Sequence, residues 1–339
     1  MSAEMDPDAV RRTDRVPHGG SDDPDLLDFS ANTNTEIPPG VEAVYRGAFE
    51  PSQRYPNDGY PDFRSAAAEY VDCDPERVVP TPGGLAAIRL AIETNVASGD
   101  SVLVPRPSFG EYAREVELQG ATPAFVPHDR MLDADPTEHA LAIVCTPNNP
   151  TGDAYDPAAL REFARDCHNS ETTLLVDEAF LGFTDRPSLA GVEGVVVVRS
   201  LTKLFGLPGI RAGFAVATAE TLDALKTARR AWNLGTPAAA VGAHCLGCEE
   251  FIAETRQRID HERERLRDGL AAEFEVYPSD APFLLLDAGG DVDELLAHAR
   301  QHDIALRDAR TFRGLDSHVR VAVKDAAAND RLLEVLADG

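Results

Sequence analysis

The residue of this chain best placed to do chemistry is a lysine that follows an apolar segment. Residues 195–198 are four valines, which predict a buried strand, and Lys203 comes shortly after them. A lysine amine that is partly desolvated at the end of a strand has a lowered pKa and can act as a nucleophile. The alternative is an ordinary surface lysine. However, the chain has only three lysines, Lys203, Lys226 and Lys324, and otherwise carries its positive charge on arginine.

Three neighbours of Lys203 are suited to binding an anion. Ser200 and Thr202 carry hydroxyl groups that can donate hydrogen bonds, and Arg211 can clamp an anionic group with its guanidinium. A nucleophilic lysine beside such a cluster is what a Schiff base with a phosphate-bearing aldehyde requires. The stretch 199–211 therefore indicates a binding site for pyridoxal phosphate.

Two further polar groups follow predicted strands. Asp177 comes directly after apolar residues 174–176, and a carboxylate buried there needs a cationic partner, such as a protonated pyridine nitrogen. The alternative for Asp177 is the N-cap of a helix. Asn149 lies in the turn 146–152 (TPNNPTG), where its amide could donate to a phenolate oxygen, although the motif alone also fits a simple turn.

A glycine-rich segment and an aromatic residue complete the candidate cofactor site. Residues 81–84 open a predicted helix, so the backbone N–H groups of Gly84 and Leu85 can approach an anion at its N-terminus. The alternative is an ordinary glycine-rich turn. Phe109 could stack on a flat ring or could be a core aromatic residue, and Tyr112 is the second choice for stacking.

The alternation of strands and helices predicts the fold class. Apolar strands are expected at 101–104, 123–126, 141–145, 173–176, 195–198 and 212–216. Helices are expected at 61–70, 81–96, 108–118, 157–168 and 220–232. This pattern predicts an α/β fold with a mainly parallel sheet sandwiched by helices, in which ligands bind at the carboxyl ends of the strands. A long charged helix at 249–274 and the short strands that follow it predict a smaller α+β domain in the C-terminal part of the chain.

Length and composition limit what the chain can do. Its 339 residues, 43% of them hydrophobic, allow a large and a small domain. We expect an N-terminal arm at 1–50 that joins the small domain, a large cofactor-binding domain at 51–233, and the small C-terminal domain at 234–339. The formal net charge of −26 argues against nucleic acid as a partner, because a duplex would be repelled.

The sequence also disfavours a membrane or secreted protein and a metal or redox site. No apolar run is long enough to cross a membrane, and residues 1–14 show no apolar signal core, so we expect a cytoplasmic protein. Five cysteines without a signal sequence favour reduced thiols. Cys245 and Cys248 form a lone CxxC, for which buried helix thiols are preferred over a metal or redox site. We expect no metal.

The order and spacing of Asn149, Asp177, Lys203 and Arg211 resemble those of the aspartate-aminotransferase fold family of pyridoxal-phosphate enzymes. The resemblance covers essentially the whole chain from His18 onward and implies the pyridoxal-phosphate fold type I. Within this family the chain is similar to the branch of histidinol-phosphate aminotransferase and threonine-phosphate decarboxylase of cobalamin biosynthesis, and more so to the decarboxylase. The segments that carry this likeness are 18–20, 28–32, 54–56, 145–152, 177–180, 199–203 and 314–317.

The resemblance implies a role for each candidate residue. Lys203 would form the Schiff base and move a proton, Asp177 would pair with the pyridine nitrogen, and Asn149 would bond the phenolic oxygen. The cofactor-binding residues that it implies are Gly84, Leu85, Phe109, Asn149, Asp177, Ser200, Thr202, Lys203, Arg211 and Tyr55. The substrate-binding residues that it implies are His18, Gly19, Asn32, Asn149 and Arg320, with Arg320 on the substrate carboxylate.

The resemblance also implies a substrate and an assembly. The substrate would be a phosphorylated amino acid, L-threonine O-3-phosphate, and Tyr55 would reach the cofactor phosphate from the neighbouring subunit of a homodimer with shared active sites. The alternative is histidinol-phosphate aminotransferase or a related class I/II aminotransferase. A non-catalytic, ligand-sensing protein on the same fold is disfavoured by the intact set of lysine, aspartate and arginine.

Two positions depart from the pattern of the aminotransferases. Phe180 stands where they usually carry a tyrosine, and in this the chain is similar to the decarboxylases. The turn 82–86 lacks the polar side chains that usually follow its glycine. Binding of the cofactor phosphate at this turn would therefore depend on backbone donors alone.

The acidic composition generates a prediction about salt. The net charge of −26 with few lysines resembles proteins of salt-loving archaea, and at molar salt the Debye length falls to about 3 Å, so self-repulsion is screened. We expect the thermal unfolding temperature to rise from low to molar salt. An unfolding temperature that does not change with salt would remove this halophilic interpretation.

Overall fold

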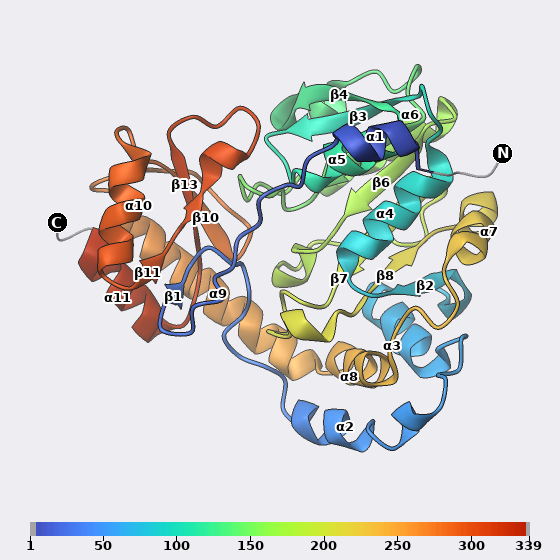
Figure 1. Cartoon of the computed structure of the whole chain (residues 1–339), viewed down its shortest axis with the longest axis horizontal. Helices are drawn as coiled ribbons and strands as arrows, with labels where there is room; N and C mark the ends of the chain where they lie inside the picture. The colour runs from blue at the N-terminus through green and yellow to red at the C-terminus, as the bar shows by residue number, and fades with distance from the viewer. Residues whose placement is uncertain (1–4, 337–339) are drawn as a thin grey trace.

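The computed structural model describes residues 5–336, which form a large domain, a small domain and an arm that contacts both (Figure 1). The large domain is built on a seven-stranded sheet. Its spatial order is β2 (Val78–Thr81), β8 (Gly213–Val216), β7 (Val195–Ser200), β6 (Thr173–Asp177), β5 (Leu141–Cys145), β3 (Ser101–Arg106) and β4 (Thr122–Pro127). Only β8 is reversed, being antiparallel to β2 and β7, so the expected mainly parallel sheet is confirmed.

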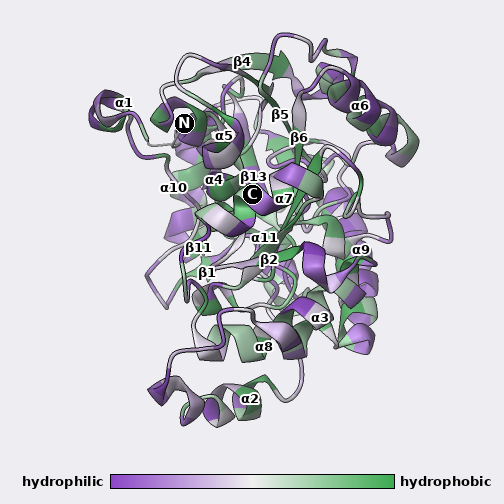
Figure 2. Ribbon diagram, turned by 90° about the vertical axis from the view of Figure 1, so that its right-hand side faces the viewer, coloured by the Kyte–Doolittle hydropathy of each residue, from purple (hydrophilic) through white to green (hydrophobic). Residues whose placement is uncertain are grey.

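Alternate residues of the sheet enter two hydrophobic cores, one on each face. In β7, Val196 and Val198 belong to one core while Val195 and Val197 belong to the other. Because both faces are covered, the strands appear in the sequence as continuous apolar runs. Figure 2 shows hydrophobic residues on the central strands and hydrophilic residues on outer helices such as α6.

The helices divide between these two cores. One core includes residues of α4 (Gly84–Asn95), α5 (Glu111–Leu118) and α7 (Ala219–Ala228). The other includes residues of α3 (Pro61–Val71), α6 (Pro157–Asn169), α8 (Thr236–Leu246) and α9 (Glu249–Leu270), and it continues into the small domain. This second core therefore joins the two domains.

The small domain combines short sheets with helices. An antiparallel sheet has the order β12 (Arg307–Asp308), β13 (His318–Ala322), β10 (Phe283–Asp287) and β9 (Glu275–Val276). The helices of this domain are α10 (Val292–Gln301) and α11 (Ala326–Leu336). The outer ends of the expected arm and C-terminal domain, residues 1–4 and 337–339, lie outside the described residues.

The arm touches both domains. Its strand β1 (Leu27–Asp28) pairs in parallel with β11 (Ile304–Ala305) of the small domain. Its helices α1 (Pro7–Arg12) and α2 (Val41–Gly47) lie against α5 and α8, respectively. The arm is therefore positioned to cross the space between the domains.

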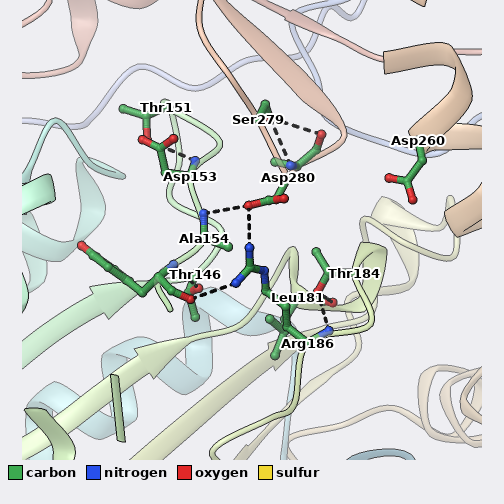
Figure 3. Close-up of polar contacts among 12 residues, drawn as sticks. Thr146, Thr151, Asp153, Ala154, Leu181, Thr184, Arg186, Asp260, Ser279 and Asp280 are labelled. Atoms are coloured by element: carbon green, nitrogen blue, oxygen red, sulfur yellow. Dashed lines mark hydrogen bonds and ion pairs between the residues drawn. The ribbon is translucent and has the colours of Figure 1, made fainter. Parts of the chain in front are cut away.

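The two domains are also joined directly by polar contacts (Figure 3). The Asp280 carboxylate, from the loop between β9 and β10, accepts from Ala154 N–H at 3.3 Å and from Arg186 Nη2 at 3.2 Å. Asp280 N–H donates to the carbonyl of Gly152 at 2.9 Å. Since residues 152–154 end the turn that carries Asn149, these contacts fix that turn against the small domain.

Several expected elements differ in the structure. The helix expected at 220–232 ends at Ala228, and Trp232 has a positive φ of 52°. The strand β2 and the helix α8 were not expected, because β2 contains a proline and α8 a stretch of small residues without clear periodicity. Within residues 5–336, no helix combines the length and apolar character needed to cross a membrane.

Candidate active site

The ends of the central strands, the arm and the small domain enclose a cavity of about 360 Å³. All of the expected site residues except Tyr55 line it. They are His18, Gly19, Asn32, Gly84, Leu85, Phe109, Asn149, Asp177, Ser200, Thr202, Lys203, Arg211 and Arg320. The volume lies within the range of small-molecule sites. In the part of the chain that the structure describes, no group of acidic, histidine or cysteine side chains is arranged to hold a metal.

Asp177 ends β6 and is only 5% exposed. Its Oδ1 accepts from Ala179 N–H at 2.9 Å, and its Oδ2 accepts from the Tyr112 hydroxyl at 2.6 Å. No helix begins at Asp177, since the next helical turn is a short 3-10 segment at Leu181–Phe183. The helix N-cap alternative is therefore wrong for this residue.

The buried Asp177 carboxylate lacks a cationic partner within the described residues. Burial raises its pKa, while the hydrogen bond from Tyr112 acts in the opposite direction. Among residues 5–336 it forms no ion pair, although it lines the cavity. A cationic ring nitrogen of a ligand in the cavity would supply the missing partner, so Asp177 fits the protonated pyridine of pyridoxal phosphate.

Tyr112 and Phe109 have different roles: Tyr112 bonds Asp177, whereas Phe109 lines the cavity. Tyr112 is completely buried, and its hydroxyl is engaged by Asp177, so it is not available to stack on a ligand. Phe109 is partly buried, lines the cavity, and meets Tyr112 edge-on at 5.5 Å between ring centroids. The sequence analysis considered Tyr112 only for stacking, because its bond to Asp177 joins residues that lie 65 positions apart.

The N-terminus of α4 forms a cup for an anion. Gly83 has a φ of 92°, and a Cβ there would lie 2.5 Å from Arg211 Nη2, so only glycine lets that guanidinium approach the backbone. A Cβ on Gly84 would lie 3.0 Å from Ser200 Cβ. Ser200 Oγ and Thr202 Oγ1 are 2.9 Å apart. The cup therefore combines helix N–H groups, two hydroxyls and one arginine, which fits a phosphate.

Lys203 lies in the turns that follow β7 and lines the cavity. Burial, together with the positive charges of Arg320 and Arg211, lowers the pKa of its amine to about 8. An amine with this pKa is partly uncharged near neutral pH, as a nucleophile or proton carrier must be. Asn34 N–H of the arm donates to the Lys203 carbonyl at 3.1 Å, which fixes the backbone of this turn.

Two arginines of the small domain lie at the other side of the cavity. Arg320 in β13 and Arg307 in β12 are register partners in the antiparallel sheet, and both are buried. Arg320 Nη1 donates to Asn149 Oδ1, and burial lowers the Arg320 pKa. Arg307 was missed by the sequence analysis. Its position at the end of the apolar segment 304–306 was the available signal, but β12 has only two residues.

The arm closes the cavity between the domains. His18 Nε2 lies 2.9 Å from Glu111 Oε1 of α5, and the carbonyl of Pro17 accepts from Arg307 Nη2 at 2.7 Å. A Cβ on Gly19 would lie 2.2 Å from the carbonyl oxygen of Ser30, so a larger residue would displace the arm. The segment 17–19 is thus held from both domains.

Tyr55 is the one expected site residue that lies apart from the cavity. Its side chain is exposed, and its ring stacks on Trp232 at 4.6 Å between centroids. Tyr45 and Phe49 of the same region are also large, exposed hydrophobic residues. Tyr55 therefore cannot contact a ligand bound in the cavity of its own subunit.

Comparison with known proteins places these observations in context. Residues 24–337 match the family model described as aminotransferase class I and II. Histidinol-phosphate aminotransferase 2 of Archaeoglobus fulgidus is 32% identical over 327 residues, which is 93% of each chain. A Caldanaerobacter subterraneus protein named provisionally as a threonine-phosphate decarboxylase is 30% identical, over 84% of this chain and 82% of that protein.

A solved structure has the same fold. Histidinol-phosphate aminotransferase of Sinorhizobium meliloti, in complex with pyridoxal-5'-phosphate, superimposes with a TM-score of 0.82 at 21% identity. The superposition covers 90% of this chain and 88% of that chain. The two proteins therefore share a fold.

The hydrogen bond from Tyr112 to Asp177 generates a prediction. In Tyr112→Phe the carboxylate loses a donor that lowers its pKa, so the Asp177 pKa should rise and the acidic limb of the kcat/KM profile should move to higher pH. Because a hydrogen bond to a charged group contributes about 1.5–3 kcal/mol, we expect kcat/KM near neutral pH to fall about ten- to hundredfold.

The matched control is Tyr155→Phe, which removes the buried hydroxyl that donates to the His128 carbonyl away from the cavity. The control should leave the pH profile in place. An unchanged profile in Tyr112→Phe would show that this hydroxyl does not govern the ionisation of Asp177.

Proposed function

The chain belongs to the class I and II aminotransferase family, and from that premise we propose that it decarboxylates L-threonine O-3-phosphate to (R)-1-aminopropan-2-ol O-2-phosphate. This reaction supplies a side-chain precursor for cobalamin. The enzyme is pyridoxal-phosphate dependent, and its fold is the pyridoxal-phosphate fold type I.

The cofactor, when bound, supplies an electron sink for charge that develops at the substrate Cα. The residues of this chain hold it and control protons. The cup at α4 and Arg211 bind the phosphate, Asp177 keeps the ring nitrogen protonated, and Lys203 Nζ carries a proton to or from Cα. Asn149 accepts from Arg320 and would bond the phenolic oxygen of the cofactor.

The observation that carries the proposal is the pair of buried arginines, Arg307 and Arg320. Like charges on register partners of a sheet repel each other, so a pair of arginines there needs a counter-charge. Among the described residues neither forms an ion pair with a carboxylate. Since Arg211 already serves the cofactor phosphate, two further guanidinium groups fit a substrate with two anionic groups, a carboxylate and a phosphate.

The bond that breaks depends on how the substrate is held. When both anionic ends are anchored, the torsion about Cα is fixed, and this torsion selects the bond to be broken. In the proposed reaction the Cα–carboxylate bond breaks, carbon dioxide leaves its electron pair on Cα, and Lys203 Nζ delivers a proton there. Phe180, buried edge-on against Phe283, supports this choice because the aminotransferases usually carry a tyrosine at that position.

Histidinol-phosphate aminotransferase activity is the second candidate. The relative from Archaeoglobus fulgidus, similar over 93% of each chain, favours it. Its substrate also carries a phosphate, which Arg307 and Arg320 could bind. It has no carboxylate, so both guanidinium groups would bind the same phosphate, whereas threonine phosphate offers each of them a separate anionic group.

We further propose that the enzyme is a homodimer in which Tyr55 completes the site of the partner subunit. The aromatic residues Tyr45, Phe49, Tyr55 and Trp232 support this, because all four are exposed and Tyr55 stacks on Trp232, and exposed apolar patches mark interaction sites. The orientation of Tyr55 away from its own cavity supports it as well.

Product analysis tests the reaction. With threonine phosphate and no keto acid, we expect carbon dioxide and aminopropanol phosphate to accumulate over many turnovers. A single turnover that leaves the amine on the cofactor, and that resumes when 2-oxoglutarate is added, would instead identify an aminotransferase. Histidinol phosphate assayed in parallel separates the two substrates.

Mixing two inactive variants tests the shared site. Lys203→Ala and Tyr55→Ala homodimers should both be nearly inactive, but a hybrid dimer has one site in which both residues are intact. Random assortment makes half of the dimers hybrids, so about a quarter of the wild-type activity should return. Verified hybrids without recovered activity would contradict the role of Tyr55.

A further inference from the structure

One of the three lysines has no role so far although it is buried. Lys324 follows β13, is 8% exposed, and forms no ion pair within residues 5–336. Its Nζ instead donates to two backbone carbonyls of the arm, those of Ala31 at 3.1 Å and Thr33 at 3.3 Å. Burying an ammonium without a carboxylate partner is costly, so a lysine at this position needs an explanation.

The two carbonyls belong to a tight turn centred on Asn32. Thr33 N–H donates to the Ala31 carbonyl at 2.9 Å, which closes a three-residue turn with Asn32 at its corner. Asn32 is 4% exposed and lines the cavity, and its Oδ1 has no partner among the described residues. The Lys324 ammonium therefore bridges the two carbonyls that flank Asn32.

The same turn connects the two halves of the active site. On one side, Ala322 N–H donates to the Phe29 carbonyl at 2.9 Å, and Arg320 Nη2 donates to the Ser30 carbonyl at 3.0 Å. On the other side, Asn34 is bonded to the carbonyls of Lys203 and Leu204. Lys324 thus holds the middle of a segment that runs from the substrate arginine to the cofactor lysine.

We propose that Lys324 is a positioning residue of the active site, which fixes the turn 31–33 so that the Asn32 amide meets the substrate. This proposal rests on the proposed function for the identity of the substrate, but not for the geometry of the turn. The ammonium donates to both carbonyls at once, whereas a neutral side chain of similar length would leave the Thr33 carbonyl without a donor and the Ala31 carbonyl with only the N–H of Thr33.

The positive charge of Lys324 also favours the binding of an anionic substrate. Burial lowers its pKa, while the nearby carboxylates of Asp28 and Asp325 raise it and favour the ammonium form. Its positive charge is also among the groups that lower the pKa of Lys203. Lys324 therefore adds to the positive potential of a cavity that is proposed to receive a doubly anionic substrate.

Three single variants of the full-length holoenzyme test the proposal. Lys324→Met keeps the length of the side chain and removes the charge and the donors, and Lys324→Arg keeps a cation with donors. Lys226→Met is the matched control, because Lys226 is the exposed lysine of α7. The measurements are hydrogen exchange of the amides in residues 27–36, the unfolding temperature, the cofactor affinity, and KM and kcat with whichever of threonine phosphate or histidinol phosphate is turned over.

In Lys324→Met we expect faster exchange in residues 27–36 and a KM about tenfold or more above that of the wild type, with kcat changed less than KM. Cofactor affinity and unfolding temperature should stay near those of Lys226→Met, and Lys324→Arg should recover most of the KM. If the enzyme turned over neither substrate, the proposed function would fail, whereas the exchange measurement would still decide the positioning of the turn.

Three results would overturn the proposal. The first is unchanged exchange in residues 27–36 of Lys324→Met. The second is a KM equal to that of the control despite faster exchange, which would make Lys324 a structural cation only. The third is a loss of activity that follows a parallel loss of unfolding temperature and cofactor affinity and is not recovered in Lys324→Arg.

Discussion

The active site depends on one buried charge, the carboxylate of Asp177. At 5% exposure it has lost most of its solvation, and two hydrogen bonds, from Tyr112 and Ala179, replace only part of it. The remainder must come from a cation inside the cavity, and the ring nitrogen of pyridoxal phosphate supplies one. Tyr112 is thus fixed in the core to serve a residue at the strand end.

The other charges of the cavity follow from its position between domains. The large domain supplies the cup for the cofactor phosphate, while the small domain supplies Arg307 and Arg320. The arm crosses between them and is bonded to both sides. Burial lowers the pKa of Lys203, and the positive charges of Arg320 and Arg211 add to this effect, so the arrangement that attracts anions also contributes to an amine with a pKa of about 8.

The sequence predicted the part of this site that is local in the chain. Lys203, Asp177 and Asn149 each follow an apolar run, so their place at the carboxyl ends of parallel strands could be inferred from periodicity alone. The roles of Arg307 and Lys324 could not be inferred in this way, although Arg307 follows the short apolar segment 304–306. Their roles depend on pairing with β13 and on arm residues about 290 positions away, and such long-range contacts leave no local pattern. Tyr112 was considered only as a stacking residue, because its bond to Asp177 needs two elements to meet.

The most direct test of this account locates the bond between the protein and the cofactor. Borohydride reduction of the holoenzyme, followed by digestion and mass spectrometry, identifies the lysine that carries the reduced cofactor. The chain has three lysines, so the result is unambiguous. The account predicts the added mass on the peptide that contains Lys203. Its appearance on the peptide of Lys324 or Lys226, or on no peptide at all, would contradict it.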